Sequence, residues 1–346
     1  MKLEKKAFWS VAAIILAVIS IWAVIHMSGM SPGTFWQSVC RAAPGPLAGA
    51  VVCSLGFIYF EGRAVLSILK EIGYPRPERS GFLYAAADYY FSAITPSATG
   101  GQPASAFFMV RDGVPPLIAT AVLLLNMIMY NAAVLTIGIA CLVMEPGIFR
   151  NFQPGCKLLI VAGFAVLLVM AFIFGMLLWH QSIIRYLAER LLTLGHKLHI
   201  IKKPEKWERK LLEAMAEYKE CVTLMAGRRI IFIKAYFFNL LQRSAQLGVT
   251  LCAFLALHGE PRLLGKLWVT QCFVAIGSNC VPIPGSMGVT DYLMLDGYMN
   301  QMERESAFHL QMLSRGLSFY CCVLFAGAIV LAAVLIGKYR GRKTPD

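Results

Sequence analysis

The sequence predicts an all-α, polytopic membrane protein, and three observations support this fold class. Of the 346 residues, 58% are hydrophobic and only 15% are charged, whereas soluble domains carry about 25% charged residues. Apolar runs of roughly 20 residues, each long enough to cross a bilayer core of about 30 Å, recur along the whole chain. Two of these runs are interrupted by Pro/Gly-rich motifs, Thr95–Gly101 and Pro282–Gly288. A single large soluble core would not need so many runs of this length.

The apolar runs form two halves, residues 1–179 and 230–346, on either side of one long hydrophilic stretch. The first run is too long for the core of a signal peptide, so we expect it to be retained as a span. The connector 180–229 is basic and carries apolar residues at helical spacing on both sides of Pro204. It is expected to form two amphipathic helices that lie on the membrane surface or cap the bundle. The runs are 7–27, 46–69, 81–110, 115–143, 157–179, 230–257, 265–299 and 309–337.

Charge bias predicts how these runs cross the membrane. The N-terminus, the connector and the C-terminal tail are the most basic segments, so all three are expected to be cytoplasmic. About six runs then cross completely, while the run 81–110 begins and ends inside and the run 265–299 begins and ends outside. We therefore expect two re-entrant broken hairpins that enter from opposite faces, as in inverted-repeat transporters. The predicted location is the cytoplasmic membrane.

The first broken motif, residues 95–103, predicts the end of one helix and the start of another inside the membrane. Pro96 and Pro103 remove backbone donors, and a Gly pair permits left-handed backbone angles. Since such backbone cannot face lipid, it is expected to line a cavity, where the next helix N-terminus would favour an anion such as phosphate. A simple helix–helix turn is the alternative. The candidate binding residues here are Thr95, Ser97, Thr99, Gly100, Gly101 and Gln102.

The second broken motif, residues 279–288, follows the same logic in the corresponding position of the second half. Pro282 and Pro284 interrupt the helix, and Gly285 and Gly288 permit the turn. Two broken segments in corresponding positions are a stronger indication of a binding site than either one alone. The candidate binding residues here are Asn279, Pro284, Gly285, Ser286 and Asp291.

The motifs Thr-Pro-Ser-Ala-Thr-Gly-Gly-Gln-Pro and Pro-Ile-Pro-Gly-Ser-Met-Gly-Val resemble the two signature motifs of the lysylphosphatidylglycerol synthase transmembrane family. That family includes the lipid-flippase domain of multiple peptide resistance factor. The resemblance covers essentially the whole chain and implies movement of a polar lipid, phosphate-bearing or aminoacylated, across the membrane. It also implies a flippase without the synthase domain, because the chain ends soon after its last apolar run. Relatives often carry an acidic residue at the position of Gln102 and a basic residue near Thr290, so their head-group preference is not expected to transfer unchanged.

Ionisable and polar residues inside apolar runs mark a transport pathway or an internal ion pair. Asp88, Arg243 and Arg315 are the deepest charged candidates, and Asn126 presents an amide within the run 115–143. Each Arg would either contact a head-group phosphate or form a structural pair with Asp88, Asp291 or Glu61. Glu61, Arg63 and Asp88 are candidates for ion coupling or ion pairing, and a local Glu61–Arg63 pair is one option.

No cofactor, metal or nucleic-acid partner is expected. The net charge of +13 fits cytoplasmic loops beside anionic lipid and is accompanied by no nucleic-acid motif. His196 and His199 lack further metal ligands nearby, and no phosphate-binding Walker motif is present. The expected activity is transport without catalysis, with a small-solute or ion transporter as the alternative and a lipid-modifying enzyme as the weaker one. The oligomeric state stays open, with a dimer as one option.

Overall fold

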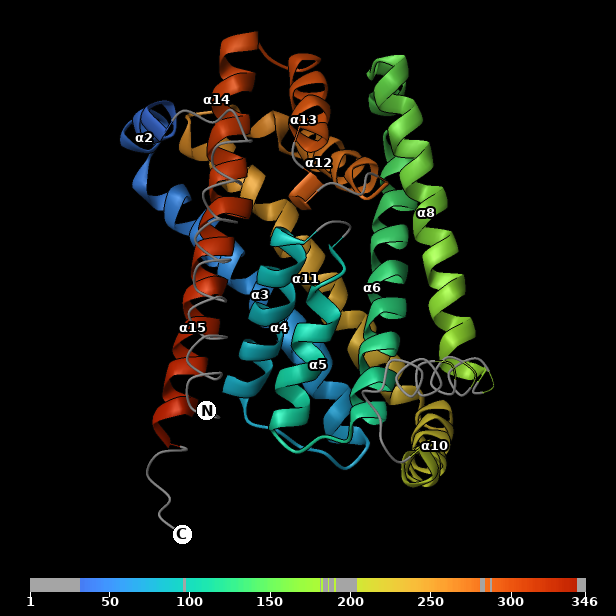
Figure 1. The fold of residues 1–346 in the computed structure, drawn as a ribbon. Coiled ribbons are helices and arrows are strands. Elements are labelled where there is room, and N and C mark those ends of the chain that lie inside the picture. Colours follow the sequence, from blue (N-terminus) through green and yellow to red (C-terminus); the bar gives the residue numbers. More distant parts are fainter. Residues whose placement is uncertain are drawn as a thin grey trace.

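The computed structural model describes residues 32–95, 98–180, 204–280, 284–286 and 288–340, together with 182, 186 and 190. Within these residues the chain is helical and contains no strand, as the all-α prediction required. The predicted first span, 7–27, and most of the first half of the connector lie outside the described residues. Figure 1 shows the described helices as one elongated bundle, with α10 lying across its lower end.

Helix starts in the first half follow the distribution of proline. Five of the helices begin with Pro and a sixth has Pro at its third position, in the first turn, where the missing backbone N–H has no intrahelical acceptor to lose. Short loops then place consecutive helices beside each other. The helices are α2 (Pro32–Arg41), α3 (Pro44–Glu71), α4 (Glu78–Ile94), α5 (Gly101–Arg111), α6 (Pro116–Met144), α7 (Pro146–Asn151) and α8 (Pro154–Trp179).

In the connector, α10 begins at Pro204, the residue at which a break was predicted. The last helix of the second half is unusual because a π-helical segment, η4, separates two α-helical parts, α14 and α15. The elements are α10 (Pro204–Gly227), α11 (Arg229–Ala256), η2 (Pro261–Leu263), α12 (Leu264–Ser278), η3 (Pro284–Ser286), α13 (Val289–Met299), α14 (Arg304–Arg315), η4 (Gly316–Cys321) and α15 (Cys322–Arg340).

Among the described residues, four helical segments are long and apolar enough to cross a membrane: α3, α6, α8 and the stretch Arg304–Leu335. The protein is therefore an all-α membrane protein. The centre of the bundle is occupied by α11, which packs along α3 and also against α6 (Figure 1). It is less apolar than these four because it carries several polar and charged residues, and those residues face the site described below.

Two pairs of short helices interrupt the pattern of long ones. In the first pair α4 packs against α5, and in the second pair α12 packs against α13. Figure 1 shows the first pair in the lower half of the bundle and the second in the upper half. These helices occupy most of the runs 81–110 and 265–299, which were expected to form the broken hairpins.

The chain reverses between these short helices with local interactions that the motifs supply. In the second break Gly285 and Gly288 have φ angles of 59° and 77°, left-handed values that glycine adopts without a Cβ clash. The hydroxyl of Ser286 donates a hydrogen bond of 2.9 Å to the carbonyl of Ser278, one of the carbonyls exposed at the end of α12. In the first break, α5 starts two residues before Pro103, because a proline in the first turn of a helix loses no hydrogen bond.

The packing of α8 on α12 depends on Gly163, and this gives a first prediction. A methyl group at Gly163 would overlap the carbonyl oxygen of Ile276 and lie 3.2 Å from Gly277 Cα. We expect Gly163→Ala to destabilise the fold by about 1–3 kcal/mol, the usual cost of overpacking. Gly175→Ala on the same helix is the control, because its nearest neighbour would be Trp179 at 3.7 Å. Thermal unfolding of both variants in one detergent measures the difference, and equal midpoints would contradict the prediction.

Candidate functional site

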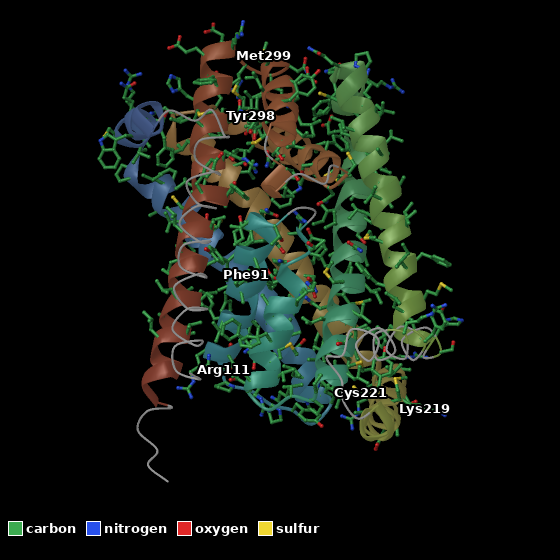
Figure 2. The ribbon with its side chains drawn as sticks, viewed as in Figure 1. Phe91, Arg111, Lys219, Cys221, Tyr298 and Met299 are labelled. Carbon is green, nitrogen blue, oxygen red and sulfur yellow. The ribbon has the colours of Figure 1, made fainter. Side chains whose placement is uncertain are left out.

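The two short-helix pairs open toward opposite ends of the bundle, and their breaks meet near its middle. Figure 2 shows Arg111, the last residue of α5, near the lower end and Met299, the last residue of α13, near the upper end. Phe91, which lies one turn before the break that follows α4, is near the middle (Figure 2). The breaks are therefore far from both ends of the molecule.

A cavity of about 900 Å³ lies where the breaks meet. Its walls come from α3, α4, α5, α6, α8, α11, α12, α13 and α14, from η4, and from both breaks. Both departures from the family motifs, Gln102 and Thr290, line it. The sequence-predicted residues that line it are Glu61, Asp88, Thr99, Gln102, Asn126, Arg243, Asn279, Gly285, Ser286 and Arg315.

Other predicted residues shape the breaks without lining the cavity. The Thr95 hydroxyl accepts a hydrogen bond of 2.9 Å from the backbone N–H of Gly100 and donates one of 2.6 Å to the carbonyl of Phe91, which closes the turn after α4. Gly101 starts α5 against Asp88, where a methyl group would overlap a carboxylate oxygen. Pro284 begins η3. Ser97 lies outside the described residues.

Arg243 of α11 is a buried cation without a carboxylate partner. Its side chain is 5% exposed, and no Asp or Glu oxygen of the described residues lies within 4.0 Å of its nitrogens. One terminal N–H donates to Gln246 Oε1 at 2.5 Å, and the guanidinium carbon lies 4.9 Å from the Tyr130 ring centroid. Nε has no hydrogen-bond partner among the described residues. A buried charge left in this state is costly, and a ligand anion in the cavity would remove that cost.

Arg315, at the end of α14, differs from Arg243 because its guanidinium already binds groups of the second break. Its Nη2 donates to the carbonyl of Gly285 at 2.6 Å, and its Nε lies 3.5 Å from Asp291 Oδ1. The guanidinium carbon is 4.5 Å from the centroid of the Phe319 ring. Asp291 also accepts a hydrogen bond of 3.0 Å from the backbone N–H of Gly288. Arg315 thus fastens the second break to the last helix.

Glu61 of α3 and Asp88 of α4 form a pair of neighbouring, interacting carboxyl groups in the wall of the cavity. The amide of Gln242 donates to Glu61 at 3.1 Å, and the amide of Gln102 donates to Asp88 at 2.6 Å. Ser92 donates to the other oxygen of Asp88 at 3.1 Å. Both carboxyl groups line the cavity and are at most 9% exposed.

The local Glu61–Arg63 pair considered from the sequence is not formed. Arg63 makes its salt bridge with Glu78 at the start of α4, and its guanidinium lies over the Phe238 ring. The two residues are two positions apart on α3, and helix residues at that spacing do not face each other. Arg63 is not among the residues that line the cavity.

The remaining polar wall joins α6 to α11. Asn239 donates a hydrogen bond of 2.9 Å to Asn126. Gln242 also lines the cavity but was not singled out in the sequence, although its helical spacing from Asn239 and Gln246 could have identified it. The opposite wall was also missed. It consists of the apolar α8 residues Val166, Leu167, Met170 and Phe174.

Within the described part of the chain, no group of three or more His, Cys, Asp or Glu side chains has the arrangement needed to hold a metal ion. His196 and His199 lie outside the described residues. The groups that the described cavity presents to a ligand are a cation, amides, hydroxyls and a carboxyl pair. This set suits the binding of a polar, negatively charged group beside an apolar wall.

In a comparison with protein-family models, the chain matches the lysylphosphatidylglycerol synthase TM region over residues 9–326. The match spans both short-helix pairs, the connector and every wall of the cavity. No curated protein matches the chain at the significance required.

Proposed function

The chain belongs to the lysylphosphatidylglycerol synthase TM family, and from this premise we propose that it moves a polar, phosphate-bearing lipid across the cytoplasmic membrane. One observation carries the proposal. The cavity between the two breaks presents an unpaired, buried arginine, Arg243, opposite an apolar wall. A lipid needs both features, because its head group must leave water while its acyl chains stay among apolar surfaces.

The proposed topology has six full spans and two re-entrant hairpins. Four of these spans are the segments that are long and apolar enough to cross a membrane. The predicted run 7–27 and α11 would be the other two. The pairs α4–α5 and α12–α13 would be the hairpins, entering from opposite faces as an inverted repeat, with both termini cytoplasmic. Their positions in opposite halves of the bundle support this arrangement (Figure 1).

In the proposed mechanism, Arg243 replaces water around the head-group phosphate, since guanidinium forms strong charge-assisted hydrogen bonds with phosphate oxygens. Asn126, Thr99 and Gln102 supply further polar contacts. The acyl chains remain along α8, whose cavity-facing and outward-facing residues are both apolar. Movement of one hairpin relative to the other would then open the site to one leaflet at a time. The lipid leaves chemically unchanged.

Reconstitution into phospholipid vesicles tests this proposal. Vesicles with fluorescent phosphatidylglycerol in both leaflets are treated with dithionite, which reduces only the outer-leaflet dye. We expect protein to make the inner-leaflet dye accessible, while vesicles without protein or with unfolded protein keep it protected. Fluorescent phosphatidylcholine and phosphatidylethanolamine report head-group preference, and chromatography checks that the lipid stays intact.

Two results would overturn the proposal. Uptake of labelled glycerol 3-phosphate without any lipid movement would establish a solute transporter with the same cavity. Conversion of the lipid to a new product, abolished by Asp88→Ala, would establish a membrane enzyme.

A further inference from the structure

The carboxyl pair of Glu61 and Asp88 joins two elements that the proposed mechanism needs to move separately. Glu61 belongs to α3, a full-length span, and Asp88 belongs to α4, an arm of the first hairpin. Through its hydrogen bond with Gln102, Asp88 also holds the start of α5. The pair is thus a contact between the body of the bundle and the tip of the first hairpin.

Polar and titratable groups surround the pair on several helices. From α4 come Ser92 and Tyr89, whose hydroxyl donates to the Ser318 carbonyl at 2.9 Å. From α11 come Gln242 and Arg243, and Arg243 interacts electrostatically with Glu61. From α5 comes Gln102, which donates to Asp88, while Asn126 of α6 and Arg315 of α14 line the same cavity.

None of these neighbours is a cation in contact with the pair. Among the described residues, no Lys, Arg or His nitrogen lies within 4.0 Å of either carboxyl group. Arg63, the basic residue nearest to Glu61 in the sequence, is held by Glu78 instead. Two buried carboxyl groups in contact cannot both be ionised without such a partner, so a single proton shared between them is the favoured state. Both carboxyl groups line the same cavity as Arg243, so the proton can exchange through that cavity.

We propose that the Glu61–Asp88 pair is a proton-binding site, and that the proton binds together with the negatively charged head group. This inference rests on the proposed function. When the pair holds one proton, it carries a single negative charge and Arg243 remains available to a phosphate. When the proton leaves to the cavity, the pair carries two negative charges, attracts Arg243 and competes with the phosphate. Proton and lipid therefore enter the site together and leave it together.

The sign of the resulting pH dependence is fixed by this competition. Lower pH loads the pair with its proton and tightens lipid binding, whereas higher pH weakens it. Glu61→Gln imitates the protonated glutamic acid in shape and removes one negative charge permanently. This variant should bind the lipid with an affinity that no longer changes with pH.

The experiment uses purified full-length protein in detergent with dihexanoyl phosphatidylglycerol as the probe. A pH-indicator dye in weakly buffered solution measures proton uptake when the lipid is added, and calorimetry in two buffers of different ionisation enthalpy gives an independent value. The wild type should take up protons on binding. Glu61→Gln and Asp88→Asn should bind without uptake. Asp296→Asn is the matched control, because Asp296 is as buried as Asp88 but lies outside the cavity, and it should behave as the wild type.

An infrared titration without lipid separates this inference from the proposed function. The carbonyl stretch of a protonated carboxyl group should be present in the wild type and lost from both pair variants. If the wild type binds lipid with neither proton uptake nor pH dependence, the proton site is overturned while lipid binding stands. If the band is present and pair-dependent but no lipid binds or moves, the proton site stands and the proposed function is overturned.

Discussion

Replacing Arg243 by Gln is expected to slow transport of phosphatidylglycerol by about tenfold to a hundredfold. The substitution removes the cation while keeping a polar side chain of moderate length. Hydrogen bonds to charged groups contribute about 1.5–3 kcal/mol, and every 1.4 kcal/mol corresponds to roughly a factor of ten. Because Arg243 has no carboxylate partner within 4.0 Å among the described residues, its removal should leave no new unpaired acid in contact. The loss should therefore appear in transport more than in stability.

Two further variants make this test specific. Arg243→Lys keeps the charge but loses the planar group that stacks on Tyr130, so partial activity is expected. Arg63→Gln is the control, because it removes an arginine whose contacts are Glu78 and Phe238 outside the cavity. The dithionite assay compares all three at equal protein content. Wild-type rates for Arg243→Gln would exclude Arg243 as the phosphate contact.

Replacing Arg315 by Gln should have its main effect on stability. It leaves Asp291 without its cation and Gly285 without its hydrogen bond, and the second break loses its attachment to α14. Breaking a buried ion pair typically costs about 3–5 kcal/mol, and we expect about 3 kcal/mol because Asp291 is 20% exposed. Thermal unfolding measures the loss. Hydrogen–deuterium exchange should accelerate over residues 279–289 and stay unchanged over 95–101, which provides an internal control.

A double-mutant cycle distinguishes an ion pair from simple loss of packing. Adding Asp291→Asn to Arg315→Gln removes the unpaired acid, so the double variant should recover part of the lost stability. Additive effects of the two substitutions would instead indicate that Arg315 stabilises the break through Gly285 and Phe319 alone.

The ends of the short helices could be predicted because their signals are local. Proline and glycine interrupt helices through their own backbone chemistry, so the ends of α4, α5, α12 and α13 fall close to the motifs. The helix termini were less accurate where hydropathy alone set the predicted boundary. For example, α4 begins at Glu78, three residues before the predicted run 81–110, because Pro77 is its N-cap and the first turn of the helix is polar.

The different roles of the two arginines could not be predicted, because they depend on tertiary packing. Arg243 and Arg315 both lie deep in apolar runs and were given the same two options. Whether an acid faces each one depends on helix rotation and on the path of a break about 30 residues away in sequence. In contrast, the Glu61–Arg63 pair could have been excluded from its spacing alone. The sequence gives no indication that α8 lines the cavity, because an apolar residue that faces a cavity looks the same in a sequence as one that faces lipid.

The π-helical segment η4 has a mechanical consequence. Above it, α14 packs on α13 of the second hairpin, and below it, α15 packs on α4 of the first hairpin (Figure 1). A π turn widens the helix and replaces the regular hydrogen-bond ladder with i→i+5 bonds. The regular α-helical hydrogen bonding is therefore interrupted between the part of the terminal helix that contacts α13 and the part that contacts α4. Deleting one residue between Gly316 and Cys321 should convert this segment to regular α-helix while α14 and α15 keep the faces they present to α13 and α4, because a π segment accommodates one extra residue in an α-helix.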